Sequence, residues 1–182
     1  MNLLCHLSGI ASFTSEVVKK AKSVNPNVEI LATRKTIPGM REIEKEAVVH
    51  GGGMTHRIRL DDAILIKDNH LNLCKDIGLA IKNSRNAHPN LMIEVEADNF
   101  EQALEATKSG ADRVMLDNFT PTQITSVMKK LENLKLLKNV KLEASGRINE
   151  KNISKYGKTG VDMISVGEIT NSVNGVDLSL EI

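Results

Sequence analysis

The chain has 182 residues and a formal net charge of +1, and 41% of its residues are hydrophobic. This composition is typical of one globular domain and excludes an intrinsically disordered chain, a collagen-like repeat and a disulfide scaffold. Only 2% of the residues are aromatic, which leaves few side chains for stacking on unpaired bases. We therefore expect no nucleic-acid partner. No apolar run approaches the roughly 20 residues of a membrane span, so we expect no membrane partner either. Cys5 and Cys74 form no metal-binding or disulfide pattern, which indicates a reducing, cytoplasmic setting.

Helical and strand-like segments alternate along the chain. Apolar residues at three-to-four spacing predict an opening helix within residues 1–25, and the apolar run at 28–33 predicts the first strand. Further helices are expected at 40–50, 71–83, 99–109, from Thr120 onward and at 149–156, and further strands at 63–66, 91–96, 113–116, 140–144 and 163–166. Thr120 is the expected N-cap of its helix, because Pro121 suits the first helical position.

This order of elements predicts a single α/β domain over residues 1–182, with no linker or low-complexity tract. Alternating strands and helices imply a parallel sheet with right-handed crossovers, which is either a barrel or a doubly wound sheet. No Gly-x-Gly-x-x-Gly motif follows the first strand, which disfavours a dinucleotide-binding fold. The length is well below the roughly 250 residues of a complete (β/α)8 barrel.

Polar and charged residues follow nearly every predicted strand. They lie at 33–36, 56–57, 67–70, 94 and 96, 117–118, 143–146 and 165–167. Glu94 and Glu96 share one face of a strand and are hard to explain as core residues, because burying an unpaired charge is costly. Singly, each cluster could be solvated loop charge or a helix start, with Asp68 or Asn69 as an N-cap. Together they favour a site at the carboxyl ends of the strands, where α/β folds place their active sites.

The charges also sort by sign along the chain. Basic residues come from the early strands: Arg34, Lys35, His56, Arg57 and Lys67. Carboxylates, Glu96 and Asp117, come from the middle, and the last two strands end in Ser145-Gly146 and Val166-Gly167. A basic wall suits a multiply anionic substrate, a carboxylate pair suits Mg²⁺, and small residues with free N–H groups suit a phosphate.

The chain resembles the quinolinate phosphoribosyltransferase family. The motifs that carry the resemblance occur in order at 32–39 (ATRKTIPG), 51–53 with 56–57 (GGG, HR), 66–70 (IKDNH), 94–96 (EVE), 115–119 (MLDNF), 142–146 (LEASG) and 164–167 (ISVG). Any one of these motifs is weak, but so many in register across nearly the whole chain are highly specific. The resemblance implies an incomplete TIM-like barrel of about six to seven parallel strands, without the N-terminal sandwich domain of the family.

The resemblance also implies a reaction. Quinolinate and phosphoribosyl diphosphate give nicotinate mononucleotide, carbon dioxide and diphosphate in NAD biosynthesis, with Mg²⁺ as cofactor. It implies that Arg34, His56, Arg57 and Lys67 face the quinolinate carboxylates, that Lys35 contacts phosphoribosyl diphosphate, and that Ser145, Gly146, Val166 and Gly167 cradle its 5′-phosphate. Glu96 and Asp117 would serve the ribose and hold Mg²⁺ shared with diphosphate, and the groups acting in the chemistry would be Lys35, Lys67, Glu96 and Asp117.

Two departures from the family pattern stand out. Arg147 occupies the position where family members commonly carry a second glycine after Ser-Gly. The chain also begins inside the helix that joins the two family domains, so an Arg that reaches the neighbouring subunit's site has no counterpart. We therefore expect weak turnover by the chain alone, and either a separate N-terminal-domain chain or a truncation. A homodimer or higher homo-oligomer is expected.

Two alternatives remain at this point. A related phosphoribosyltransferase could use another acceptor, although Lys67-Asp68-Asn69-His70 argues against it. A non-catalytic remnant could bind phosphate ligands; the intact set of charged residues indicates catalytic ancestry and not present activity.

Overall fold

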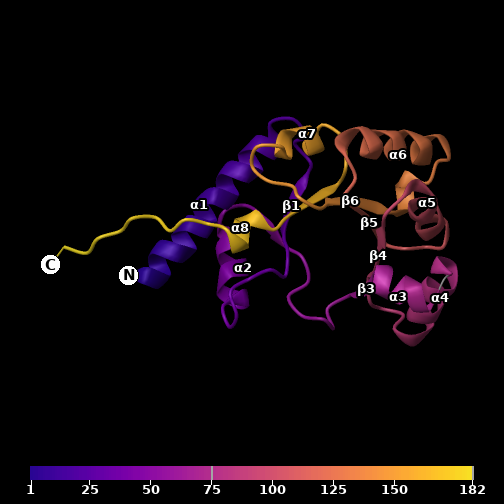
Figure 1. Ribbon diagram of the computed structural model, residues 1–182, viewed down its shortest axis with the longest axis horizontal. Helices are drawn as coiled ribbons and strands as arrows, with labels where there is room; N and C mark the ends of the chain where they lie inside the picture. The colour runs from indigo at the N-terminus through magenta and orange to yellow at the C-terminus, as the bar shows by residue number, and fades with distance from the viewer. Residues whose placement is uncertain (75, 182) are drawn as a thin grey trace.

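A computed structural model describes residues 1–74 and 76–181 as a seven-stranded, fully parallel sheet with helices outside it (Figure 1). In chain order the elements are α1 (Asn2–Lys22), β1 (Glu29–Ala32), α2 (Arg41–His50), β2 (Met54–Thr55), β3 (Ile64–Ile66), α3 (Asp68–Leu73), α4 (Ile77–Ala87), β4 (Ile93–Ala97), α5 (Phe100–Lys108), β5 (Arg113–Asp117), α6 (Pro121–Asn133), the 3-10 helix η1 (Leu137–Asn139), β6 (Lys141–Ser145), α7 (Ile153–Gly157), β7 (Met163–Val166) and α8 (Glu168–Asn171).

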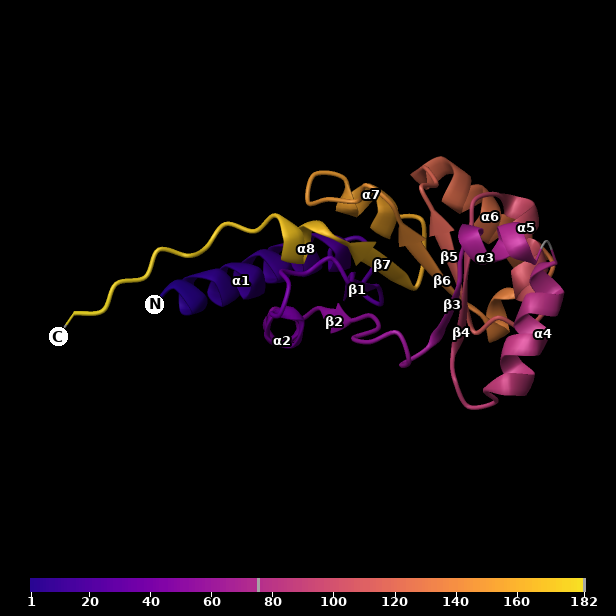
Figure 2. The same ribbon diagram turned by 60° about the horizontal axis from the view of Figure 1, so that its bottom comes forward.

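The sheet is an open half-barrel with strand order β2-β1-β7-β6-β5-β4-β3. Strands β2 and β3 follow one another in the sequence but lie at opposite edges, so the segment between them crosses the open side (Figure 2). This segment begins with His56 and Arg57. The predicted incomplete barrel of six to seven parallel strands is therefore confirmed.

Local capping explains where several helices begin. The Thr120 side chain accepts the Gln123 N–H, Gln123 caps Thr120 in return, and Pro121 is the first helical residue, as the sequence predicts. Asn99 caps α5 in the same way by accepting the Gln102 N–H. These caps fix the points at which the chain leaves β4 and β5.

Three sequence-based boundaries are wrong. The helix expected at 71–83 is two helices, α3 and α4, because the Asp76 side chain accepts the Leu79 N–H and starts a new helix; residue 75 lies outside the described residues. Helix α3 begins directly after Lys67, so neither Asp68 nor Asn69 is its N-cap. The helix expected at 149–156 begins only at Ile153, since the Asn149 side chain accepts two backbone N–H groups and forms a turn first.

The two faces of the sheet differ in chemistry. Val95 lies in the hydrophobic core with Ala103 of α5, whereas Glu94 and Glu96 alternate onto the inner face of the half-barrel. The same alternation puts Arg113 and Asp117 of β5 on that inner face. The helices thus cover an aliphatic layer, and the concave side is left for polar groups.

The chain ends lie away from this concave side. The segment after α8 runs beside α1, where the Val176 N–H donates to the Cys5 carbonyl at 2.9 Å (Figure 1). In the part of the chain that the structure describes, no helix is both long enough and apolar enough to cross a membrane.

Candidate active site

A cavity of about 600 Å³ opens at the carboxyl ends of the strands. It is lined by all the predicted site residues except one: Arg34, Lys35, His56, Arg57, Lys67, Glu96, Asp117, Ser145, Gly146 and Gly167. The exception is Val166, whose side chain is fully buried and which pairs with Ala32 in the β-ladder. The sheet therefore brings residues more than 130 positions apart in the sequence to one cavity, as expected for strand ends in an α/β fold.

The basic wall of the cavity comes from two backbone segments. Arg34 and Lys35 follow β1, and the Thr170 hydroxyl of α8 donates to the Lys35 carbonyl at 2.8 Å. Arg57 follows β2, and its guanidinium donates to the Ala63 carbonyl within the segment that joins β2 to β3. Burial and the neighbouring Arg34 lower the pKa of Arg57. Two guanidiniums that repel each other in a partly buried wall mark a place that favours an anion.

Lys67 and Glu96 form a direct ion pair in the cavity, with Nζ 2.6 Å from Oε2. Glu96 is mostly buried, and Asp117 lines the same cavity from the next strand. The ammonium of Lys67 shows that the Glu96 carboxylate can hold a cation from the cavity side. Two carboxylates on adjoining strands, open to a cavity, fit Mg²⁺, because this ion takes one or two carboxylates together with waters and substrate phosphates.

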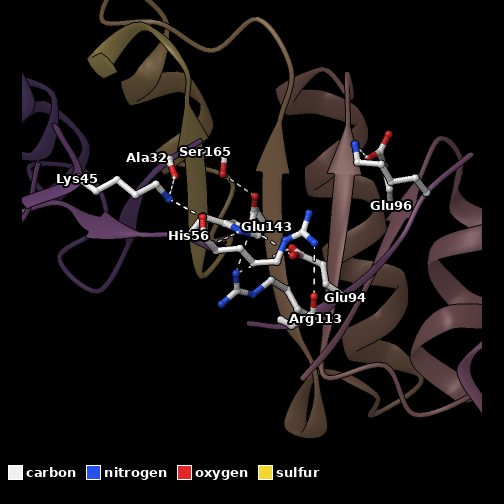
Figure 3. Close-up of polar contacts among 11 residues, drawn as sticks. Ala32, Lys45, His56, Glu94, Glu96, Arg113, Glu143 and Ser165 are labelled. Atoms are coloured by element: carbon white, nitrogen blue, oxygen red, sulfur yellow. Dashed lines mark hydrogen bonds and ion pairs between the residues drawn. The ribbon is translucent and has the colours of Figure 1, made fainter. Parts of the chain in front are cut away.

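A charged cluster lies beneath the cavity. His56 Nε2 lies 2.9 Å from Glu94 and 3.3 Å from Glu143, two fully buried carboxylates on β4 and β6. Arg113 Nη1 approaches Glu143 at 3.3 Å, and the Ser165 hydroxyl donates to Glu143 at 2.6 Å (Figure 3). Carboxylates and cations thus meet inside the half-barrel. The burial of Glu94, which is hard to explain from the sequence alone, follows from its pairing with these cations.

The proton of this cluster resides mainly on His56. Burial alone would lower the pKa of His56, but its hydrogen bonds to the Glu143 and Glu94 carboxylates outweigh burial and raise the pKa to about 9. Burial raises the pKa of Glu94. In Glu143 burial acts in the same direction, yet the His56 and Ser165 hydrogen bonds leave its pKa lowered. The backbone N–H of Arg57 lies 2.8 Å from His56 Nδ1, an arrangement that favours an unprotonated Nδ1. The two carboxylate charges favour the protonated ring more strongly than this amide dipole opposes it.

The far end of the cavity is built from tight backbone. Gly146 has a φ of 98°, and a Cβ on it would lie 2.4 Å from the Asn118 side-chain oxygen, so only glycine fits there. Arg147 also has a positive φ, 53°, and the Asn152 amide donates to its carbonyl. Its side chain is exposed and lines the cavity beside Gly146. A non-glycine residue held in this region is strained, and such strain persists mainly at functional sites.

Two buried charged residues near the cavity, Arg113 and Lys45, were missed in the sequence. Arg113 belongs to the buried cluster, and Lys45 of α2 is fully buried beside the basic wall. Glu143 was noted as part of the polar segment 143–146, but no role was assigned to it. Period-two spacing from Asp117 could have placed Arg113 on the inner face. Lys45 gave no signal, because a lysine between Glu44 and Glu46 in a helix reads as a solvated residue.

Comparison with known proteins identifies the family. Residues 10–181 match the family model described as Quinolinate phosphoribosyl transferase, C-terminal domain. The chain belongs to this family. It is 48% identical to a probable nicotinate-nucleotide pyrophosphorylase [carboxylating] of Methanocaldococcus jannaschii, covering 100% of this chain and 65% of that protein. It is 41% identical to the Bacillus subtilis protein of the same name, again over 100% of this chain and 61% of that protein.

Solved structures of the same family agree with the fold. NadC from Streptococcus pyogenes superposes with a TM-score of 0.91 at 36% identity, over 100% of this chain and 61% of that one. The nicotinate-nucleotide pyrophosphorylase from Francisella tularensis gives 0.89 at 40% identity, over 98% and 61%. The predicted membership of the quinolinate phosphoribosyltransferase family is thus confirmed. The chain spans under two thirds of the length of these relatives.

Proposed function

We propose that this chain carries the site that transfers phosphoribosyl from phosphoribosyl diphosphate to quinolinate with decarboxylation, giving nicotinate mononucleotide, carbon dioxide and diphosphate. The enzyme class is nicotinate-nucleotide diphosphorylase (carboxylating), a pentosyltransferase. The observation that carries the proposal is the single cavity lined by a basic wall, a carboxylate pair and a glycine-containing cradle. Family membership supports the same substrates.

The cationic and anionic residues of the cavity have different proposed roles. Arg34 and Arg57, with Lys67, bind and orient the two carboxylates of quinolinate. Lys67 is paired with Glu96 in this structure, so an acceptor carboxylate would compete with Glu96 for its ammonium. That exchange would free Glu96 for the ribose and for Mg²⁺, and it links acceptor binding to the assembly of the metal site.

The chemistry then needs positioning more than a nucleophile from the protein. The pyridine nitrogen forms a bond to the ribose anomeric carbon as the bond to diphosphate breaks, and Glu96 and Asp117 stabilise the positive charge that develops on the ribose. Glu96 and Asp117 would hold Mg²⁺ shared with the substrate, and the ion would supply positive charge to the departing diphosphate. Loss of carbon dioxide leaves an electron pair on the ring carbon, and this carbanion is then protonated. The positive charge of the Lys67 ammonium stabilises the carbanion before it is protonated.

The test is product formation with defined substrates. The chain is incubated with quinolinate, phosphoribosyl diphosphate and MgCl₂, alone and with a separately supplied N-terminal domain, and nicotinate mononucleotide and diphosphate are quantified. We expect product that depends on quinolinate. Turnover of nicotinate but not quinolinate would establish the alternative acceptor, and absence of both turnover and phosphoribosyl diphosphate binding would establish a remnant. Oligomeric state and cytoplasmic location stay predictions, and sedimentation would measure the former.

Arg147 provides a further test at the phosphate end. We expect Arg147→Gly to stabilise the fold by about 1 kcal/mol, since glycine adopts a positive φ without strain. We expect the same variant to weaken phosphoribosyl diphosphate binding about tenfold, because a charged hydrogen bond to phosphate is lost. Calorimetry and thermal unfolding measure the two effects, and Arg147→Asn, which tolerates the backbone but lacks the charge, is the control. Tighter binding by both variants would mean that Arg147 crowds the cradle.

A further inference from the structure

Lys45 is a buried lysine that the proposed chemistry does not use. Its side chain is 1% exposed, and it extends from α2 toward the end of β1 (Figure 3). The ammonium donates to the Arg57 carbonyl at 2.7 Å and to the Ala32 carbonyl at 3.4 Å. A lysine is rarely buried to this degree unless it is paired. The two carbonyls that accept its hydrogen bonds therefore indicate its role.

These two carbonyls belong to the two segments that form the basic wall. Ala32 is the last residue of β1 and precedes Arg34 by two positions, and the other carbonyl is that of Arg57 itself. The ladder between β1 and β2 ends at Ala32 and Thr55, with one longer bond of 3.4 Å from the His56 N–H to the Ala32 carbonyl. Past the end of this ladder, the Lys45 ammonium links the two segments through its hydrogen bonds to the Ala32 and Arg57 carbonyls. This link therefore lies between the end of the ladder and the side chains of the basic wall.

The charge around Lys45 is unusual for a structural lysine. Arg41 from its own helix, Arg34 from the segment after β1 and Arg57 from the segment after β2 repel its ammonium, and Asp62 is the carboxylate that attracts it. Burial, followed by Arg41 and Arg34, lowers the pKa of Lys45 to about 8. A buried cation among cations costs stability, and an apolar side chain of similar size commonly suits such a place better. A bound dianion would offset this cost.

We propose that Lys45 is a positioning residue of the acceptor site, which tethers the Arg34 and Arg57 segments so that both guanidiniums meet the carboxylates of one dicarboxylate acceptor. The proposal rests on the proposed function, since it takes quinolinate as that acceptor. In this proposal Lys45 does not contact the substrate, because its ammonium donates to two backbone carbonyls. It also predicts that the acceptor and the phosphoribosyl donor depend on Lys45 to different degrees.

The experiment compares Lys45→Met with Lys22→Met, which removes an exposed lysine of α1 and matches the change in net charge. Calorimetry measures quinolinate and phosphoribosyl diphosphate binding to each full chain. For Lys45→Met we expect quinolinate affinity to fall about tenfold, phosphoribosyl diphosphate affinity to change less than twofold, and the thermal midpoint to stay or rise. Equal quinolinate affinity in the wild type and Lys45→Met, or equal loss for both ligands, would overturn the proposal. Absence of quinolinate binding by the wild type, with the N-terminal domain supplied, would instead overturn the proposed function.

A second measurement on the wild type covers the case in which Lys45→Met does not fold. Since the pKa of Lys45 is lowered to about 8, binding of a dianion beside it should take up a fraction of a proton near pH 8 and almost none at pH 6.5. His56, whose pKa is raised to about 9, is already mostly protonated at pH 8 and contributes less. Calorimetry in buffers of different ionisation enthalpy reports this uptake. Equal proton uptake at both pH values would contradict the proposal.

Discussion

Asp117→Asn and Glu96→Gln should each lower Mg²⁺-dependent turnover by about 100- to 1000-fold, which is the usual cost of removing a group that stabilises charge in a transition state. Both side chains line the cavity from adjoining strands, so neither change opens a hole in the aliphatic core. We therefore expect thermal unfolding to change little. The measurement is steady-state turnover at several MgCl₂ concentrations, in the presence of a separately supplied N-terminal domain of the family. Calorimetry of Mg²⁺-dependent phosphoribosyl diphosphate binding accompanies it.

The matched control is Asp98→Asn, which removes an exposed carboxylate just past the end of β4. It should leave both turnover and Mg²⁺ dependence within twofold of the wild type. Glu96→Gln carries an additional signature, because it releases Lys67 from its ion pair and should tighten quinolinate binding as it removes turnover. Wild-type rates and an unchanged Mg²⁺ requirement in both variants would show that the metal is held elsewhere.

The candidate site could be predicted largely because it depends on local patterns. Strand ends are visible in sequence as apolar runs followed by polar residues, and parallel strands bring those ends to one rim. Glu96 and Asp117 were placed correctly at the cavity by this reasoning alone. Val166 was not, although the bounds of its strand, 163–166, were predicted correctly: it is the last residue of β7, and its side chain lies in the hydrophobic core and not in the cavity.

The ion pairs beneath the cavity could not be predicted from local sequence patterns. His56 meets Glu94 and Glu143 because the segment after β2 crosses the open half-barrel, and sequence spacing does not encode that crossing. The strand β2 has two residues, too few for any periodicity. The break between α3 and α4 was hidden for the opposite reason: helical periodicity continues across it, and one capping side chain, Asp76, decides it.

Arg113→Met should cost about 3 kcal/mol of unfolding free energy, because it leaves His56 as the one remaining cation, among the described residues, beside the buried carboxylates Glu94 and Glu143. Urea unfolding measures the loss. The control is Arg85→Met, which breaks the partly exposed pair of Arg85 with Asp112 and should cost under about 1 kcal/mol. In the double variant Arg113→Met, Glu94→Gln one carboxylate is removed together with the guanidinium, so most of the stability should return.

The pH dependence of Arg113→Met separates charge from packing. The pKa of His56 is raised to about 9 from its ordinary 6.5, so the folded protein holds a proton that the unfolded chain releases between these values. Its contribution is complete below pH 6.5 and is lost as the pH rises through 9. In Arg113→Met the imidazolium is the main remaining positive charge on the two carboxylates, so stability should fall more steeply from pH 7 to 9 than in the wild type. A constant loss across this range would mean that Arg113 matters through its packed side chain, and that the charges beneath the cavity do not balance one another as their geometry indicates.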